Sequence, residues 1–577
     1  MPRDVRSTWW FSLTLASVLL AHSARAPAQS TDARQEFERG LIALHEFEYE
    51  EANEAFRRAQ QLDPAFCMAY WGEAITYHQS LWRRENIDAA RQALQRLGTT
   101  PAARAAKCRT PPDADMLAAV EILFGRGDPA NRRRDYAEAM GRAHERRRDD
   151  PDVASLYALS LLGTMSRGLI GTADDHEGHS QGLAGSRIQK QVAAILESVL
   201  NTHPTHRGAL HYLLHTYDDP DHASLGLSTA RAYAQIATAS HARHMPSHIF
   251  LQLGLWSEAA ASDRAAYDAS VEWVRRKNTS AALRNFHALS WLEYELLQLG
   301  RYREAWQTIA ELEPVVKATG QVNLLSDLSS MRARFAVETR RWDLLASERN
   351  FGNVNELFAI GMSAARAGRA DLAVRASRAL AERARAEQEG DLRPAIAIMQ
   401  QEVAALIELA AGRREAAVDM LKAAASAERR LPAPLGLPEP VKPAPELLGE
   451  ILLETGRPQE AVEGFTETLT RHARRSLSMV GLARAAAAIG DMGIARRRYR
   501  ELLGNLDHAD EDMPEVREAR AALDSTSESR VPITTRTVSI ALVAAAVLAG
   551  FLVVRRRKGR SSGPNRADRR RKKKGRS

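Results

Sequence analysis

Cysteine is almost absent from this chain, which has only Cys67 and Cys108 in 577 residues. Neither residue has the paired spacing of a zinc knuckle or of a redox CxxC motif, so the sequence excludes both kinds of site. In an exported protein two such thiols can join as a disulfide, whereas in a reducing compartment they pack as small buried side chains. The sequence leaves both alternatives open.

Strand-like runs of Val, Ile and Thr are scarce as well. Between its two ends the chain is instead rich in Ala, Leu, Arg and Glu, and its apolar residues recur at helical rather than alternating spacing. A chain of this length without alternating strands and helices either splits into several cores or stacks repeats on one another. The predicted fold class is therefore all-α.

Long apolar runs are confined to the two ends. At the start, Arg3 and Arg6 precede an apolar stretch from Trp9 to Leu20 and the small-residue sequence Ala26-Pro27-Ala28. This order is typical of a secretory signal peptide. We expect residues 1–28 to be removed, with the mature chain beginning near Gln29.

The second apolar run covers residues 537–554, which are uncharged and numerous enough to cross a bilayer as a helix. Arg536 precedes this run and Arg555 follows it. The sequence thus predicts one C-terminal transmembrane helix. By the positive-inside rule, the tail over residues 555–577 is cytoplasmic and the large segment before the helix is extracytoplasmic.

The positive net charge of the chain belongs to this tail. The tail holds thirteen Lys or Arg against Asp568 alone, an excess larger than the +8 of the whole chain, so the preceding residues are mildly acidic overall. A basic run beside a membrane helix is typical of contact with anionic lipid headgroups. We expect membrane lipid as the partner of the tail and no nucleic acid as the partner of the main domain.

Helical repeats are indicated first by the segment after the signal peptide. Gly40, Ala52, Phe56, Ala59 and Pro64 occupy the small, small, aromatic, small and proline positions of the tetratricopeptide repeat, which this segment resembles. Small residues let the two helices of a hairpin approach, and the aromatic residue fills the gap between them. The resemblance implies a solenoid of helical hairpins.

A turn glycine followed by alanine five positions later recurs downstream and predicts further hairpins, because glycine suits the left-handed end of a helix. The turn glycines are Gly254, Gly300, Gly368, Gly412, Gly456 and Gly490. The predicted organisation is N-terminal repeats over 29–200, a histidine-rich repeat core over 201–305, repeats over 306–430, a proline-rich loop over 431–445, C-terminal repeats over 446–504 and a polar stalk over 505–536.

Histidine is concentrated in one place. Eight of the seventeen histidines lie between His203 and His248. His211 and His215 are four residues apart, as are His244 and His248, so each pair projects from one face of a helix. If the helix that carries His248 begins near Pro246, then His211, His215 and His248 converge. His244 lies at the entrance of that helix, and His287 on the next helix joins them.

Grouped imidazoles are credible ligands for zinc or copper, so His211, His215, His244 and His248 are the predicted metal ligands. The alternative is a structural clamp, in which the histidines only make hydrogen bonds across helix ends. The sequence HYLLH lacks the acidic general base of the HExxH metalloprotease motif. No catalytic residue is therefore predicted.

The histidine segment also resembles a family of bacterial tetratricopeptide-repeat proteins. The resemblance covers His203 to Trp256 and lies in the patterns HPxHxGALHYLLHxYDDP and HAxHMPSHIF. It implies a helical-repeat fold and a bacterial origin, but the family has no established activity and implies no catalytic residue. At Ser290, where the family often has an acidic residue, this chain departs from the pattern.

Two functions from different classes follow. The leading hypothesis is a membrane-anchored, extracytoplasmic scaffold at the bacterial cell envelope, whose concave groove binds a protein or peptide. The alternative is a metal-binding protein or metal-dependent hydrolase that uses a divalent metal such as zinc or copper, with Asp218 or Asp219 as base or extra ligand. The sequence favours a binding protein over an enzyme.

Overall fold

The computed structural model describes residues 31–165, 187–345, 353–387, 392–511 and 513–524. It divides the chain into two units, Met1–Glu511 and Asp512–Ser577. The predicted signal peptide, transmembrane helix and basic tail lie outside the described residues. Within the described ranges, no helix is both long and apolar enough to span a bilayer.

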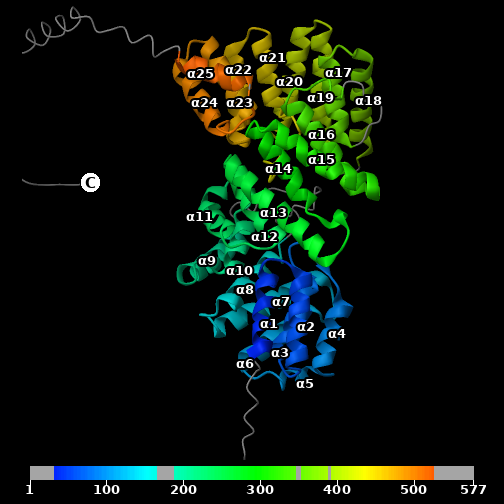
Figure 1. Cartoon of the computed structure of the whole chain (residues 1–577), viewed down its shortest axis with the longest axis vertical. Helices are drawn as coiled ribbons and strands as arrows, with labels where there is room; N and C mark the ends of the chain where they lie inside the picture. Colours follow the sequence, from blue (N-terminus) through cyan, green and yellow to red (C-terminus); the bar gives the residue numbers. More distant parts are fainter. Residues whose placement is uncertain (1–30, 166–186, 346–352, 388–391, 512, 525–577) are drawn as a thin grey trace, which may run out of the picture. The chain divides into compact units, whose positions relative to one another are not determined.

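The first unit is built from helices, as predicted, apart from a two-residue antiparallel hairpin of β1 (His78–Gln79) and β2 (Arg84–Glu85) (Figure 1). Its first helices are α1 (Thr31–His45), α2 (Tyr49–Leu62), α3 (Cys67–Thr76), α4 (Ile87–Leu97), α5 (Pro101–Ala105), α6 (Pro111–Leu123), α7 (Pro129–Arg146) and α8 (Pro151–Leu162). The middle helices are α9 (Arg187–Thr202), α10 (Arg207–Thr216), α11 (Ala223–Ala234), α12 (Ser240–Gln252), α13 (Trp256–Lys277), the 3-10 helix η1 (Ala281–Leu283), α14 (Phe286–Gln298) and α15 (Tyr302–Thr319).

The remaining helices of the first unit are α16 (Val322–Glu338), α17 (Val354–Arg366), α18 (Ala370–Ala386), α19 (Leu392–Ala410), α20 (Arg414–Glu428), α21 (Ala444–Glu454), α22 (Pro458–Arg471), α23 (Ser476–Ala488) and α24 (Met492–Asn505). The second unit contains α25 (Pro514–Asp524), so the segment predicted as a polar stalk includes a helix. The proline-rich segment contains no helix before Ala444.

The hairpins end in the turns that the sequence predicts. All six predicted turn glycines have a positive φ, between 67° and 83°. In this left-handed region glycine carries no steric cost from a Cβ atom. Each of these turns follows the first helix of a hairpin. The second helix of the hairpin packs back against the first, as α13 does against α12.

Aromatic side chains fill the space between hairpins, as the repeat motif requires. A Cβ atom on Gly40 would lie 2.7 Å from the ring of Phe56, and one on Gly72 would lie 2.5 Å from it. Phe465 sits in the same way against Gly449 and Gly481. The same packing unit therefore occurs near both ends of the first unit.

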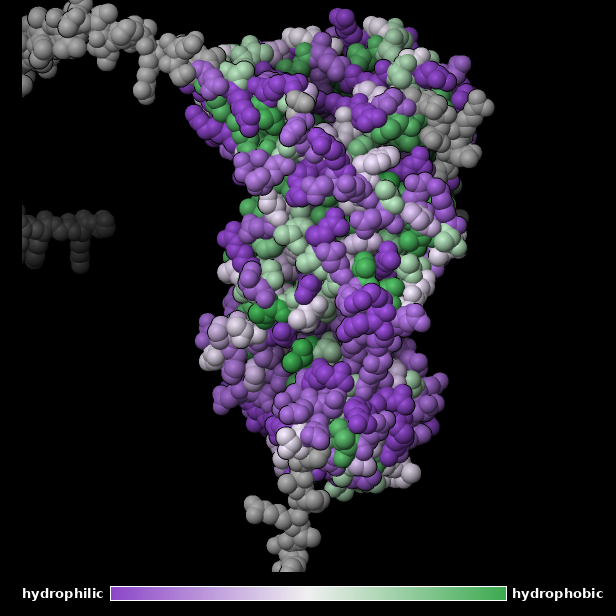
Figure 2. Space-filling model, in the orientation of Figure 1, coloured by the Kyte–Doolittle hydropathy of each residue, from purple (hydrophilic) through white to green (hydrophobic). Residues whose placement is uncertain are grey.

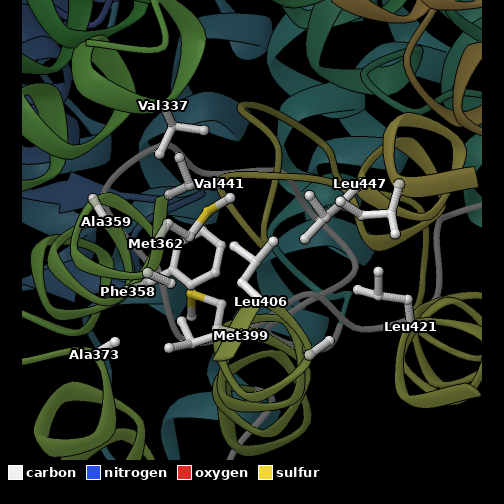
Figure 3. Packing of buried hydrophobic residues seen from close by; sticks show 14 of the residues in the cluster. Val337, Phe358, Ala359, Met362, Ala373, Met399, Leu406, Leu421, Val441 and Leu447 are labelled. Atoms are coloured by element: carbon white, nitrogen blue, oxygen red, sulfur yellow. The ribbon is translucent and has the colours of Figure 1, made fainter. Parts of the chain in front are cut away.

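The cores are apolar and the surface is not. Figure 3 shows part of one hydrophobic cluster, where Phe358, Met362, Met399 and Leu406 meet between α17 and α19. On the face shown in Figure 2, hydrophilic residues predominate and hydrophobic ones are scattered among them. Burial of the apolar faces is what holds the stacked hairpins together.

Cys67 and Cys108 form a disulfide, with their Cα atoms 5.2 Å apart. The bond ties the first residue of α3 to the segment after α5, across 41 residues of chain. The alternative of two separate thiols, left open by the sequence, does not hold.

Candidate metal centre

Two neighbouring helices present most of the clustered histidines. On α10, His211 and His215 are one turn apart, and 0% and 2% of their surfaces are exposed. The side chain of His206 caps this helix, because its Nδ1 accepts the Ala209 N–H at 3.1 Å. The cap fixes where the helix begins and hence which face the two buried histidines share.

The second helix begins earlier than expected. α12 starts at Ser240, six residues before Pro246, which lies inside the helix. The expected start near Pro246 is wrong. A proline removes one backbone hydrogen bond and crowds the preceding turn, but here the helix continues through it. His241, His244 and His248 consequently follow one another along one face of α12.

The first triad consists of His211, His215 and His241, and its ligand nitrogens lie within 4.8 Å of one another. His241 Nε2 is 3.4 Å from His215 Nε2. His211 donates its Nδ1–H to the carbonyl oxygen of His45 at 2.6 Å, which leaves its Nε2 lone pair directed to the other side of the ring. That Nε2 atom has no hydrogen-bond partner among the described residues.

The second triad consists of His244, His248 and His287, from α12 and α14. The Nε2 atom of His244 lies 2.9 Å from that of His248 and 3.1 Å from that of His287. Behind the rings are two carboxylates: Asp218 accepts from His248 Nδ1 at 2.8 Å, and Asp263 accepts from His244 Nδ1. All four of these residues are at least 97% buried.

This arrangement sets the tautomers. A neutral imidazole has one N–H, and when Asp218 and Asp263 are both ionised they hold that N–H at Nδ1 of His248 and His244. Their Nε2 atoms therefore face each other as lone pairs, and two lone pairs cannot hydrogen-bond. A cation between the nitrogens resolves the conflict, and carboxylates that orient metal-binding histidines are the usual second shell of such sites.

Burial keeps the imidazoles neutral. It lowers the pKa of His211 to about 3. Burial, with the neighbouring histidines, also holds the pKa of His215, His241 and His244 well below the ordinary value. Neutral imidazole is the form that binds metal ions.

The carboxylate behind His244 has a buried acidic neighbour. Burial and the adjacent Asp263 raise the pKa of Glu295 well above its usual range. Burial raises the pKa of Asp263 well above its usual range as well, so the two carboxyl groups behind His244 form a buried pair that holds protons more tightly than exposed carboxyls do.

An aromatic ring covers each triad. The ring of Phe47 lies 4.5 Å from that of His211 and 5.6 Å from that of His241, measured between centroids. Trp291 lies 4.5 Å from His248 and 5.4 Å from His287. In each triad one histidine, His241 or His287, is only partly buried.

The two triads are neighbours. The ring of His215 interacts electrostatically with His244 and His248, and that of His241 interacts with His287. Along α12, the first triad is centred about five residues before the second, which corresponds to roughly 7 Å at the helical rise. The six histidines therefore form two separate three-nitrogen sites side by side.

A third group, His45, Asp152 and His206, has a different character. Asp152 Oδ1 accepts from Nε2 of His45 at 2.9 Å and from Nε2 of His206 at 3.0 Å. The remaining nitrogens accept hydrogen bonds from the Tyr212 hydroxyl and the Ala209 N–H. Because every nitrogen has a protein partner of the right kind, this group is explained as a hydrogen-bond network.

The structure places the four predicted ligands in two sites rather than one. His211 and His215 join His241, while His244 and His248 join His287. Two candidate residues for a base or an extra ligand have other partners. Asp218 lies behind His248, and Asp219 accepts from His222 Nδ1 at 2.8 Å.

Ser290, where the chain departs from the family pattern, lies on α14 one turn after His287. Its hydroxyl accepts a hydrogen bond from Arg334 at 2.6 Å.

Comparisons with known proteins complete the description of the site. No protein-family model matches the sequence, and no curated protein matches it. Among solved structures, the APC/C hetero-tetramer Cut9–Hcn1 is similar at 10% identity and a TM-score of 0.28, covering 87% of this chain and 78% of that one. Yeast Tom70 is similar at 12% identity and a TM-score of 0.28, covering 88% and 99% of the two chains.

The TPR domain of P58(IPK) is similar at 12% identity and a TM-score of 0.21, covering 87% of this chain and 99% of that one. Similarities at this level carry no argument about the histidine sites.

Proposed function

We propose that this protein binds transition-metal ions at two histidine triads carried by a scaffold of helical hairpins. The observation that carries the proposal is the convergence of the Nε2 atoms of His244, His248 and His287 at 2.9 and 3.1 Å while carboxylates occupy the Nδ1 side of two rings. A structural clamp would instead pair each nitrogen with a protein group, as the His45, Asp152 and His206 network does.

The donor set limits the choice of metal. Both sites offer only imidazole nitrogens, which suit zinc and copper, and not the oxygen ligands that calcium and magnesium require. Three protein ligands leave a further coordination position. Asp218 and Asp219 are engaged with His248 and His222, so neither acts as a base toward that position, and we propose binding rather than hydrolysis.

We further propose that the described region is held outside the cytoplasm at the cell envelope. The support is the predicted signal peptide over residues 1–28, the predicted membrane helix over residues 537–554 and the disulfide between Cys67 and Cys108. Disulfides persist in oxidising compartments and are rare in the cytosol. In this proposal the basic tail contacts lipid headgroups on the opposite side of the membrane.

Protein or peptide binding in a concave groove stays a prediction from the repeats. The helices expected to line the groove near the histidines are covered by a later part of the chain. Gln252 of α12 donates to the Pro434 carbonyl at 3.1 Å, and Tyr294 of α14 accepts from Arg475 at 3.0 Å. The histidine sites are therefore the stronger basis for a function.

The test is the metal content of the full chain, produced without a histidine tag and dialysed against a weak chelator. We expect two equivalents of zinc or copper in the wild type and one in each of the variants His215→Ala and His248→Ala. His203→Ala, an exposed histidine outside both triads, is the matched control and should keep both ions. A wild type without bound metal, or triad variants with unchanged metal content, would refute the proposal.

A further inference from the structure

The first half of the proline-rich loop, residues 431–437, lies across helices that are distant in sequence, and we call it the strap. It contains no helix, and none of its residues is fully buried. Its sequence is Leu-Pro-Ala-Pro-Leu-Gly-Leu, and another proline, Pro438, follows. A residue that precedes a proline is biased toward extended backbone, so this sequence favours an extended strap before any contact is made.

Side chains of two other hairpins hold the strap by its backbone. Gln252 of α12 donates to the carbonyl oxygen of Pro434 at 3.1 Å. Arg471, the last residue of α22, donates to the carbonyl oxygens of Leu431 and Pro432 at 3.2 and 2.9 Å. Hydrogen bonds of this kind recognise the main chain of an extended segment, and side-chain pockets then supply the specificity.

Buried aromatic rings form the surface on which the strap lies. Trp256, Trp291 and Tyr294 are all at least 95% buried and belong to one hydrophobic cluster, against which Leu437 of the strap packs. Grooves lined by aromatic rings suit proline-rich segments, because such segments are ordered before they bind and lose little conformational entropy.

Gly436 makes the closest approach to these rings. A Cβ atom at this position would lie 2.7 Å from Cζ2 of Trp291 and 3.2 Å from Cη2. The φ of Gly436 is not in the left-handed region, so the ring and not the turn requires glycine here. The surface therefore discriminates between sequences, because it accepts only a residue without a side chain at this point.

The strap is seated less firmly than the chain that follows it. A small cavity, with room for about one water molecule, remains between Pro434 and Gly436 of the strap and the side chain of Tyr294. By contrast, Lys442 is 2% exposed, and its Nζ donates to carboxylates of α21 at 2.7 and 2.8 Å. The strap can therefore leave its groove while the start of α21 stays anchored.

We propose that the groove formed by Gln252, Trp256, Trp291, Tyr294 and Arg471 binds an extended proline-rich peptide of a partner protein, with the pattern Pro-x-Pro-x-Gly that the strap itself carries. The strap occupies this site in the free protein, and the partner's peptide displaces it. This function goes beyond metal binding and does not depend on it.

The strap competes as a tethered ligand. A segment tethered by short linkers has an effective concentration on the order of 1 mM at its own site. If a free peptide of the same sequence binds the empty groove with a Kd of about 50 µM, the tethered copy weakens its binding to the wild type by roughly 20-fold.

The test measures binding of a fluorescent peptide, with the sequence of residues 430–439, to the full chain by fluorescence polarisation. In one variant the same number of Gly and Ser residues replaces residues 432–437, which removes the strap and keeps the groove. In a second variant, Gly436→Val, the new side chain meets the ring of Trp291 and lifts the strap. A peptide of scrambled sequence is the control, and far-ultraviolet circular dichroism shows whether each variant keeps its helices.

We expect the strap-replaced chain to bind the peptide at least tenfold more tightly than the wild type does, with Gly436→Val between the two. In the strap-replaced chain, Arg471→Met removes the donor to two carbonyl oxygens and should weaken binding about tenfold. Arg497→Met, at an exposed position on α24, is the matched control and should bind like its parent. The scrambled peptide should bind at least tenfold more weakly.

Three results would overturn the proposal. They are no peptide binding to either opened chain with its helices intact, equal affinity for the wild type and the opened chains, and equal affinity for the scrambled peptide. If the strap-replaced chain does not fold, the comparison of Gly436→Val with the wild type decides. Each result can occur whether or not the histidine triads bind metal, so this proposal and the proposed function fail separately.

Discussion

Replacing Asp218 by asparagine tests the role of the carboxylate behind the second triad. Asp218 is 2% exposed and accepts from His248 Nδ1 at 2.8 Å. Asparagine has nearly the same shape, and its amide oxygen can still accept this hydrogen bond. The substitution therefore removes the negative charge and leaves the ring orientation largely in place.

The expected loss follows from the position of the charge. Removing an outer-shell partner of a metal-binding histidine typically lowers metal affinity 10- to 100-fold, or about 1.4 to 2.7 kcal/mol. Asp263 still supports His244, so the site should be weakened and not abolished. No carboxylate of the described residues bonds to the rings of the first triad, which should keep its affinity.

The assay is competition for Zn(II) between a chromophoric chelator and the full chain, with Asp221→Asn as the control. Asp221 is exposed, lies three residues from Asp218 and changes charge by the same amount. Asp221→Asn should bind Zn(II) like the wild type. If Asp218→Asn binds Zn(II) as tightly as its control, the carboxylate does not support a metal ligand and the reasoning is refuted.

Three further predictions concern stability. Gly481→Ala would place a Cβ atom in the ring of Phe465, and such overpacking should cost about 1 to 3 kcal/mol and lower the melting temperature. Cys108→Ser removes the cross-link to Cys67 over 41 residues and should cost about 4 kcal/mol by chain entropy, while the wild type without reductant should show no reactive thiol. Burial raises the pKa of Glu428 to about 7. Between the usual carboxyl pKa and pH 7 the folded state therefore binds more protons than the unfolded state. The free energy of unfolding falls as pH rises through that window. Glu428→Gln removes this dependence and should be more stable than the wild type at pH 8 by up to about 3 kcal/mol, with little difference at pH 4.5, as measured by thermal melting.

Each of these predictions has a matched outcome that would contradict it. Gly493→Ala, at an exposed position in the first turn of α24, should change stability by no more than about 0.5 kcal/mol, so equal effects of the two glycine variants would count against the ring packing. Reactive thiols in the unreduced wild type would contradict the disulfide. A Glu428→Gln variant that melts below the wild type at pH 8 would show that the buried carboxylate is stabilising.

The helical hairpins could be predicted because their signals are local. Each hairpin carries its own signals, which are a glycine at a helix end, an alanine five residues later and an aromatic residue between small ones. The positive φ of Gly254 or Gly456 follows from such neighbours in the sequence. The first hairpin breaks the pattern at Phe47, where no glycine is present. The missing glycine was a usable signal, but its reason, contact with His211, lies more than a hundred residues away in sequence.

The histidine sites could be predicted only in part for a similar reason. Spacing on one helix links His211 with His215 and His244 with His248, yet which pair meets which third histidine depends on how the helices pack. His241 was missed because the helix was expected to begin at Pro246, which placed it outside the face that it shares with His244.

Asp263 was not anticipated either. It belongs to α13 and accepts a hydrogen bond from His244 on α12. In the sequence it stands out only as an acidic residue on an alanine-rich helix face, and its complete burial is visible only in the structure. Partners that lie on different helices are set by tertiary packing, which spacing along one helix does not report.

The most direct test of the two-site account is a crystal structure of the full chain soaked with Zn(II), with anomalous data collected at the zinc absorption edge. The account predicts one peak bonded to the Nε2 atoms of His211, His215 and His241, and a second peak bonded to those of His244, His248 and His287. Crystals with no anomalous peak at either triad, and with the histidine nitrogens paired to protein groups instead, would contradict it.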